Sequence, residues 1–475
     1  MAAKKTYDLI VVGSGPGGYV AAVRAAQLGM TVACIEKAPR LGGACLNVGC
    51  IPSKALLDSS EYYHLAQHHF RAHGIQTGQV RLDLKGMMAR KDQVVKELTE
   101  NVKQLLDGHK VQIIRGTAAL KDKDRVEVTP AQKASGKARR RVLEAKAILL
   151  ATGSVASALP GIAFDGKKIV SSTEALRFNA VPKHLAIVGG SYIGLELGSV
   201  WQRLGAKVTI IEMLPQIAPA SDGQVARTLQ RILKQQGLSF MLKARLEKAR
   251  ILQKSVQLTV SADGKTEKLS CDRLLLAVGR KPNTEGLGLD KLGVQTDPES
   301  GHVVVDECYR TSVPTIYAIG DLTPGPMLAH KASAEGVAAV ECLAGLAGEV
   351  NYDAVPAVVY TWPEVASVGL TEEQVKARGI PYCVGTFPFS GAGRARCMGE
   401  KDGFVKLIAH GKSDRVLGVH IIGPRAADMI AECVLALEFN ASAEDISRTI
   451  HGHPTFSEAL QEAAMGIRQC SIYAS

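Results

Sequence analysis

Two cysteines, Cys45 and Cys50, stand five residues apart in the segment LGGACLNVGCIPSK. On a slightly distorted helix this spacing lets the two sulfur atoms meet, and a disulfide that closes so short a loop is reactive rather than structural. Zinc is the alternative, but a zinc site needs two more ligands at comparable spacing, and no other Cys or His cluster in the sequence supplies them. The pair therefore favours redox chemistry, and we expect no metal.

The other cysteines are spread singly along the chain without the spacing of metal ligands. We expect them to be buried or inert thiols. They are Cys34, Cys271, Cys308, Cys342, Cys383, Cys397, Cys433 and Cys470.

The elements that position the pair belong to an internal repeat. Residues 8–37 recur as residues 184–213, and Cys45 follows the first copy closely. Each copy has an apolar strand, a glycine-rich turn, a helix with small residues and a β-branched strand that ends in an acid. Two copies predict an α/β fold with two Rossmann-like dinucleotide-binding domains.

In the first copy, three glycines have distinct expected tasks. Gly13 permits a tight turn, Gly15 lets the backbone approach a pyrophosphate, and Gly18 lets the helix pack close to the sheet. The pyrophosphate then lies on a helix N-terminus, where free N–H groups and the helix dipole favour an anion. Glu36 is expected to accept hydrogen bonds from ribose hydroxyls.

In the second copy the corresponding residues are Gly189, Ser191, Gly194 and Glu212. Glu212 follows Gly189 by 23 residues, the same separation as between Gly13 and Glu36. A carboxylate here, with no Arg beside it, repels a 2′-phosphate, so we expect NAD rather than NADP. Ser191 departs from the pattern, and its side chain either crowds the pyrophosphate or hydrogen-bonds to it.

Further motifs follow in order along the whole chain: ATGS, AVGRKPN, AIGD, MLAHKA and HGHPTFSEA. Together with GGACLNVGCIPSK and the two repeats, they closely resemble the dihydrolipoamide dehydrogenase family, within the class I pyridine nucleotide-disulfide oxidoreductases. The resemblance implies FAD and NAD as cofactors, and a C-terminal α+β dimerisation domain beside the two Rossmann-like domains.

The resemblance also implies roles for single residues. Cys45 would exchange with a dithiol substrate, and Cys50 would face the flavin. Lys54 would lie near the flavin and pair with Glu196, since burying either charge alone costs several kcal/mol. Further cofactor contacts would be made by Thr152, Gly153, Gly279, Asp321 and Ala329.

The C-terminal motif contains two histidines and a glutamate. Dithiol oxidation needs a base near neutral pH, because only a thiolate attacks a disulfide, and histidine titrates there. The resemblance implies that His453 is this base, that Glu458 orients its ring, and that both serve the cysteines of a second subunit. A homodimer is therefore expected.

The implied activity is oxidation of dihydrolipoyl groups, free or on a lipoyl carrier domain, with electrons passing through the Cys45–Cys50 pair and FAD to NAD. Docking in a 2-oxo acid dehydrogenase or glycine cleavage complex is also implied. Another flavoprotein disulfide reductase of the same family is one alternative. A mainly structural subunit docked in such a complex is another.

At 475 residues the chain is too long for one hydrophobic core. We expect an FAD-binding domain with the redox disulfide at 1–152 and an NAD-binding domain at 153–281. A central segment at 282–349 would complete the FAD domain, and an interface domain would span 350–475.

The formal net charge of +11 raises nucleic acid or a membrane surface as partners. The densest basic run, residues 133–141, has no aromatic residue for base stacking and is expected to be an exposed loop. The longest uncharged stretch, residues 147–164, is interrupted by Gly153, Pro160 and Gly161. We therefore expect no nucleic acid, no membrane span and, because the N-terminus does not resemble a signal peptide, a cytoplasmic location.

Overall fold

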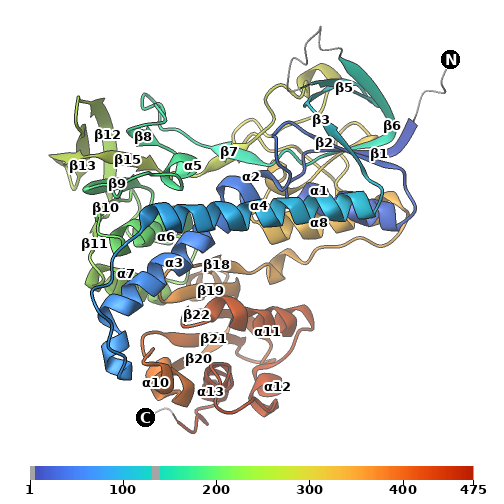
Figure 1. Cartoon of the computed structure of the whole chain (residues 1–475). Helices are drawn as coiled ribbons and strands as arrows, with labels where there is room; N and C mark the ends of the chain where they lie inside the picture. The colour runs from blue at the N-terminus through green and yellow to red at the C-terminus, as the bar shows by residue number, and fades with distance from the viewer. Residues whose placement is uncertain (1–5, 131–139, 474–475) are drawn as a thin grey trace. The chain divides into compact units, whose positions relative to one another are not determined.

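The computed structural model describes residues 6–130 and 140–473. Most of the basic run at 133–141 lies outside the described residues. The chain divides into two compact units, each assembled from segments that are distant in the sequence (Figure 1). The first unit contains Met1–Ala55, Lys85–Ser157 and Gly279–Val350, and the second contains Leu56–Leu84, Ala158–Val278 and Asn351–Ser475.

The first unit is built on a sheet whose central strands are covered on both faces. Its strand order is β3 (Gln112–Arg115), β2 (Val32–Glu36), β1 (Thr6–Val12), β6 (Arg141–Leu150), β5 (Arg125–Thr129) and β4 (Thr117–Asp122), with β17 (Ile316–Ala318) also paired with β6. Pairing is parallel except at β5 and β4. Leu9 and Val11 of β1 pack into one hydrophobic cluster, whereas Ile10 and Val12 pack into another. Such strands appear in sequence as continuous apolar runs.

Three helices cover the face that carries Leu9 and Val11: α1 (Pro16–Gln27), α4 (Leu84–Gly108) and α8 (Ala329–Leu343). Helices α1 and α8 are in backbone contact, because a Cβ on Gly336 would lie 2.6 Å from the Gly17 carbonyl oxygen. Two further helices, α2 (Gly43–Val48) and α3 (Cys50–His68), follow β2. Strands β7 (Ser154–Ala156) and β16 (Arg280–Pro282) of the same unit pair as a short antiparallel ribbon.

The second unit repeats the parallel arrangement. Its strand order is β11 (Leu238–Met241), β10 (Lys207–Ile211), β9 (His184–Val188), β15 (Arg273–Leu276) and β8 (Ile169–Val170). The helices that follow β8, β9 and β10 are α5 (Ser172–Ala175), α6 (Tyr192–Arg203) and α7 (Gly223–Gln235). An antiparallel sheet of β12 (Ala244–Ile251), β13 (Val256–Ala262) and β14 (Lys265–Cys271) lies between β11 and β15 in the chain.

The C-terminal part of the second unit is an antiparallel sheet with helices. Its strand order is β18 (Ala357–Val359), β19 (Glu364–Gly369), β22 (Val416–Gly423), β21 (Phe404–His410) and β20 (Tyr382–Pro388). The helices are α9 (Glu372–Ala377), α10 (Gly393–Met398), α11 (Ala426–Glu438), α12 (Ala443–Arg448) and α13 (Glu458–Gly466). Strand β20 and helix α13 pack tightly, since a Cβ on Gly385 would lie 1.9 Å from the Ala463 carbonyl oxygen. No helix within residues 6–130 and 140–473 has the length and apolar character that crossing a membrane requires.

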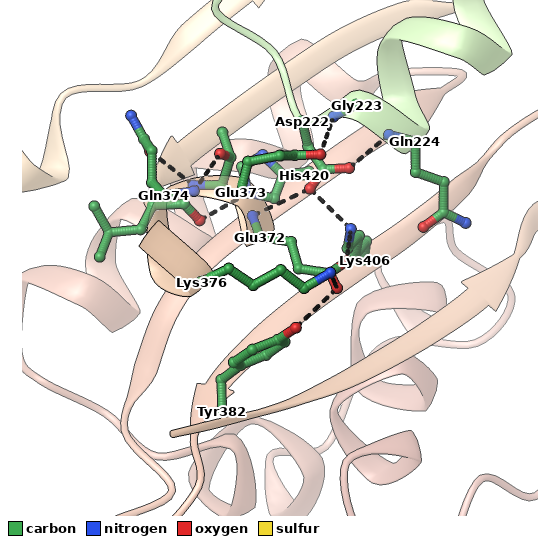
Figure 2. Close-up of polar contacts among 12 residues, drawn as sticks. Asp222, Gly223, Gln224, Glu372, Glu373, Gln374, Lys376, Tyr382, Lys406 and His420 are labelled. Atoms are coloured by element: carbon green, nitrogen blue, oxygen red, sulfur yellow. Dashed lines mark hydrogen bonds and ion pairs between the residues drawn. The ribbon is translucent and has the colours of Figure 1, made fainter. Parts of the chain in front are cut away.

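A buried group of charged side chains joins helix α7 to this C-terminal sheet (Figure 2). Lys406 of β21 places its Nζ 2.8 Å from Oδ2 of Asp222 and 2.6 Å from Oε2 of Glu372. Asp222 also caps α7 by accepting the N–H of Gln224 at 3.0 Å. Hydrogen bonds from Lys376 and then Lys406 lower the pKa of Glu372 to about 2. We call Lys406, Asp222 and Glu372 the Lys406 cluster, and it connects two parts of the second unit.

Candidate active site

Cys45 and Cys50 meet at a break between two helices. Cys45 lies in α2 and Cys50 begins α3, so the predicted distorted helix is in fact two helices joined at Gly49. A Cβ on Gly49 would lie 3.0 Å from the Ala44 carbonyl oxygen and 3.3 Å from the Cys45 Cα, so glycine allows this tight connection. The two sulfurs are thiols in hydrogen-bonding contact.

The surroundings of Cys45 act on its thiol in opposite directions. The hydrogen bond with Cys50, followed by burial, raises the pKa of Cys45, while the positive charge of Lys54 lowers it. Lys54 follows Cys50 by one helical turn of α3. The nearby positive charge of Lys54 favours the thiolate of Cys45, the form that attacks a disulfide.

The first glycine-rich turn fits tightly against the end of strand β6. Gly13 has φ of +105°, and a Cβ there would lie 2.4 Å from the Ala151 carbonyl oxygen. A Cβ on Gly18 would lie 2.0 Å from the Gly13 carbonyl oxygen. Oε2 of Glu36 accepts the N–H of Ser14 at 3.0 Å and its hydroxyl at 2.6 Å, and Oε1 accepts the N–H of Ala38 at 2.7 Å. The carboxylate is thus held in one orientation and keeps lone pairs for a ribose hydroxyl.

Gly15 behaves differently, and its surroundings fit a bound phosphate. Its backbone is extended, with φ of −68°, and a Cβ there would meet only the Gly43 Cα, at 3.9 Å. Neither the backbone conformation nor the protein's packing therefore requires glycine at this position. Space beside the N-terminus of α1 suits the pyrophosphate of a dinucleotide, whose close approach does require a residue without a side chain.

The second turn reproduces this geometry. Gly189 has φ of +108°, and a Cβ on Gly194 would lie 2.0 Å from the Gly189 carbonyl oxygen. Glu212 accepts the N–H of Gly190 at 2.6 Å and that of Leu214 at 2.8 Å. Ser191 has the same extended conformation as Gly15, with φ of −90°, and its side chain makes no capping hydrogen bond to α6. This turn therefore also fits a dinucleotide, with a hydroxyl at the N-terminus of the helix.

The ATGS and AVGRKPN motifs are joined by hydrogen bonds. Thr152 donates its hydroxyl to the Asn283 carbonyl at 2.8 Å, and the Asn283 side chain donates to the Thr152 carbonyl at 3.1 Å. The N–H of Asn283 donates to the Gly153 carbonyl at 2.8 Å. Gly279 comes just before this ribbon with φ of +120° and nothing within 4 Å of a Cβ.

Asp321 of the AIGD motif is attached to the same ribbon. It accepts a hydrogen bond from the Ser154 hydroxyl. Arg280 donates from Nε to the Ser154 hydroxyl oxygen at 2.7 Å and from Nη2 to the Ser154 carbonyl at 2.7 Å. The three motifs, far apart in sequence, therefore form one polar cluster at the end of the first sheet.

A buried ion pair fixes the turn that carries Asp321. Lys331 and Glu335 of α8 have side chains that are 0% exposed, and their Nζ and Oε1 atoms are 3.2 Å apart. Glu335 accepts the Gly320 N–H at 2.6 Å, and Lys331 donates to the Gly320 carbonyl at 3.0 Å. Each charge is thus paired and hydrogen-bonded, as burial requires. Ala329 begins the helix that supplies both residues.

His453 and Glu458 form a hydrogen-bonded pair at the start of α13. Nδ1 of His453 lies 2.7 Å from Oε1 of Glu458, and the side chain of His453 is 78% exposed. Burial raises the pKa of Glu458, but hydrogen bonds from His453 and from the Thr455 N–H outweigh it and lower that pKa. An ionised Glu458 orients the imidazole with Nδ1 protonated, which leaves Nε2 as the basic nitrogen. The neighbouring His451 binds Glu432 instead, at 2.8 Å.

Glu196 and Lys54 lie in different units. Glu196 is buried in α6, and its Oε1 accepts the N–H of Tyr360 at 3.0 Å. The predicted pairing of these two side chains stays a prediction. Among residues 6–130 and 140–473, no group of three or more His, Cys, Asp and Glu side chains is arranged to hold a metal ion.

Sequence reasoning missed several residues that support the site. Ser154, Arg280 and Lys331 lie inside motifs that were recognised, but a motif does not say which side chain contacts which. Glu335 could have been found from its position four residues after Lys331 on a helix, a spacing that pairs opposite charges. Ser14 gave no such indication, because its role depends on the folded position of Glu36.

A two-cysteine centre with two dinucleotide turns defines a class of disulfide oxidoreductase, and comparisons with known proteins agree. Residues 7–336 match the pyridine nucleotide-disulphide oxidoreductase family, and residues 355–464 match the dimerisation domain of that family. The chain therefore belongs to the pyridine nucleotide-disulphide oxidoreductase family.

Within this family, the chain is similar to named dihydrolipoyl dehydrogenases. The chain is 49% identical to dihydrolipoyl dehydrogenase 3 of Pseudomonas aeruginosa, covering 98% of each chain. It is 48% identical to mitochondrial dihydrolipoyl dehydrogenase of Pisum sativum, over 96% of this chain and 91% of the relative. The solved structure of LpdA from Mycobacterium tuberculosis superposes with a TM-score of 0.87 at 27% identity, over 96% of this chain and 98% of the other.

These findings confirm several of the predictions. The fold class is confirmed, with two Rossmann-like dinucleotide-binding domains and a C-terminal α+β dimerisation domain. The prediction of an oxidoreductase of the dihydrolipoyl dehydrogenase type that uses FAD and NAD is also confirmed. The dimerisation domain supports the predicted homodimer.

Proposed function

We propose that this enzyme oxidises dihydrolipoyl groups with NAD and that Cys45 and Cys50 carry the exchange. The observation that supports this most directly is the contact between the two thiols at the break between α2 and α3, beside the first dinucleotide turn. When bound, FAD supplies the two-electron chemistry that connects a dithiol with a nicotinamide. The protein's own task is to hold thiols, charges and protons in place.

The exchange begins with the cysteines joined as a disulfide. A dihydrolipoyl thiolate attacks the sulfur of Cys45, so a mixed disulfide forms and Cys50 leaves as a thiolate. The second thiolate of the same dihydrolipoyl group then attacks the substrate sulfur that is bonded to Cys45. This step closes the lipoyl disulfide and releases the Cys45 thiolate. Two electrons have then moved from the substrate to the cysteine pair, and the charge of Lys54 favours the thiolate form.

The two substrate protons need a base, for which we propose His453. Its hydrogen bond to Glu458 fixes the ring, and its exposed side chain lies in the dimerisation domain. An exposed base in that domain suits a site completed by a second copy, so His453 of one subunit would serve the cysteines of the other. Glu196 would pair with Lys54 and keep its charge near the flavin.

We assign FAD to the first turn and NAD to the second. Gly13, Gly15, Gly18 and Glu36 would hold the first ligand, and Gly189, Ser191, Gly194 and Glu212 the second. Further contacts would come from Thr152, Gly153, Gly279, Asp321 and Ala329. The segments 1–152 and 282–349 would together bind FAD, 153–281 would bind NAD, and 350–475 would form the dimer interface.

The lipoyl group would be presented by a carrier domain, with the enzyme docked in a 2-oxo acid dehydrogenase complex. We propose a cytoplasmic location, as the sequence suggested. A pull-down of lipoylated carrier proteins from native extract, followed by their oxidation with NAD, would connect the enzyme to one complex.

The test is anaerobic turnover of the purified holoenzyme with dihydrolipoamide and NAD, following NADH and the flavin spectrum. We expect rapid NADH formation, and a loss on the order of a thousand-fold or more in Cys45→Ser and Cys50→Ser, because the covalent step needs both sulfurs. Cys383→Ser is the matched control, since Cys383 is an exposed thiol on β20. Flavin reduction by NADH without any oxidation of dihydrolipoamide would keep the family and exclude this substrate.

A further inference from the structure

A second pair of cysteines meets in the first unit, although the sequence suggested isolated thiols. Cys308 lies in a turn in which Oδ1 of Asp306 accepts the N–H groups of Cys308 at 2.9 Å and Arg310 at 2.8 Å. Cys342 lies in the last turn of α8, with its sulfur 3.5 Å from the Gly348 carbonyl oxygen. The thiols of Cys308 and Cys342 hydrogen-bond to one another.

Both sides of this contact are fixed to the core. Tyr309, next to Cys308, is buried in the same hydrophobic cluster as Val340 of α8. The end of α8 is tied to α1 by the ion pair between Arg24 and Glu341, with Nη2 and Oε1 2.6 Å apart. The two sulfurs are therefore held together by ordered backbone on each side, and both cysteines are partly exposed to solvent.

We propose that Cys308 and Cys342 form a second thiol–disulfide exchange site, which low-molecular-mass disulfides oxidise to an intramolecular disulfide. The thiolate of one cysteine attacks the external disulfide, forms a mixed disulfide and releases one small thiol. The other cysteine, already in contact, then displaces the second small thiol and closes the internal bond. Two protein thiols are oxidised and one small disulfide is reduced to two thiols.

The environment of Cys308 makes this exchange depend on pH. The hydrogen bond with Cys342, followed by burial and the negative charge of Asp306, raises the pKa of Cys308, while Arg310 lowers it. Cys308 is therefore protonated at neutral pH, and oxidation should become faster as the pH rises.

The bond would close a loop that contains functional elements. Between Cys308 and Cys342 lie strand β17, the turn with Asp321, and the Lys331–Glu335 pair that fixes this turn. Because a cross-link reduces the freedom of the unfolded chain, oxidation should raise the thermal unfolding midpoint of this region. The site thus responds to the thiol–disulfide balance without using the catalytic pair.

The test is disulfide mapping of the holoenzyme after equilibration in glutathione buffers of increasing oxidation. After alkylation and trypsin digestion, Cys308 falls in residues 292–310 and Cys342 in residues 332–376, whereas Cys45 and Cys50 share residues 41–54. We expect a disulfide-linked peptide that joins 292–310 to 332–376. It should appear at a lower ratio of oxidised to reduced glutathione than the mixed disulfide on the exposed control Cys383.

Variants separate a built pair from two independent thiols. In Cys308→Ser we expect Cys342 to collect glutathione as a mixed disulfide, and the reverse in Cys342→Ser. Neither variant should lose dihydrolipoamide oxidation, so failure of this proposal is distinguishable from failure of the proposed function. If the wild-type protein forms only mixed disulfides at Cys308 and Cys342, or if both stay alkylatable in the most oxidising buffer, the second exchange site does not exist.

Discussion

The two glycine-rich turns share their backbone hydrogen bonds to a buried acid, but the surrounding contacts of the two units differ. In both, a glycine with φ above +100° begins the turn, and a second glycine brings the helix against its carbonyl. In both, a buried acid accepts N–H groups from the turn and from the segment after its own strand. The two copies share the turn glycines and the buried acid. These are the groups that a dinucleotide requires, because the glycines shape the phosphate position and the acid shapes the ribose position.

The two units differ in the contacts that hold one helix of each, α1 in the first and α7 in the second. After the first turn, α1 packs against α8 through glycines at backbone distance, and the ion pair between Arg24 and Glu341 joins the same two helices. In the second unit, α7 is joined to the C-terminal sheet by the Lys406 cluster (Figure 2). Helix α1 is therefore held by close backbone packing and a partly exposed ion pair, whereas α7 is held by a buried charge network that a single substitution can unbalance.

The largest expected effect comes from removing the cation of the Lys406 cluster. Lys406→Met leaves the Asp222 carboxylate, which is 0% exposed, without its counter-ion. We expect the free energy of unfolding to fall by roughly 3–5 kcal/mol, because an unpaired buried charge is costly. The measurement is chemical denaturation followed by circular dichroism.

Lys376→Met is the matched control for Lys406→Met. Lys376 also pairs with Glu372, with its Nζ 2.7 Å from Oε1, but its side chain is 59% exposed. An exposed ion pair contributes about 0–1 kcal/mol, so this variant should be nearly as stable as the wild type. Equal losses in the two variants would show that burial of the cluster is not what matters.

A smaller effect, specific to each copy, is expected from adding one methyl group at the glycine that brings the helix against its turn. This glycine is Gly18 in the first copy and Gly194 in the second. Gly18→Ala and Gly194→Ala would each place a Cβ 2.0 Å from a backbone carbonyl oxygen, which only a backbone shift can relieve. We expect a similar loss of roughly 1–3 kcal/mol in both. The two variants should differ in the cofactor that they lose. We expect Gly18→Ala to release flavin, and Gly194→Ala to keep flavin and bind NAD more weakly.

Flavin absorbance after gel filtration and NAD titration by calorimetry distinguish these outcomes. Gly78→Ala serves as the control, since Gly78 is exposed and has nothing within 4 Å of a Cβ. Loss of flavin in both turn variants would argue against separate sites for the two cofactors.

The comparison also shows which parts of the structure were accessible from sequence. The turns were predictable because each glycine and acid acts within one strand–turn–helix–strand unit, so spacing carries the information. The Lys406 cluster was not, because Asp222 and Lys406 are 184 residues apart and neither belongs to a recognised motif. The contact between Cys308 and Cys342 was missed for the same reason, since only the packing of α8 brings them together.

The smallest expected effect tests a position at which the two turns differ, Gly15 in the first and Ser191 in the second. Gly15 and Ser191 both have extended backbone, so exchanging glycine and serine causes no backbone strain at either position. Because the Ser191 hydroxyl makes no capping hydrogen bond, it is available to donate to a phosphate at the N-terminus of α6. A net hydrogen bond contributes about 0.5–1.5 kcal/mol, so Ser191→Ala and Ser191→Gly should each weaken NAD binding by roughly 2- to 12-fold.

Comparing Ser191→Ala with Ser191→Gly separates hydrogen bonding from crowding. Alanine keeps the Cβ and removes only the hydroxyl, whereas glycine removes both. If the hydroxyl donates to the pyrophosphate, NAD titration should give similar losses for both variants, with unchanged unfolding midpoints. Tighter NAD binding by Ser191→Gly than by the wild type would instead mean that serine crowds the ligand, and that the second turn achieves its affinity despite this residue.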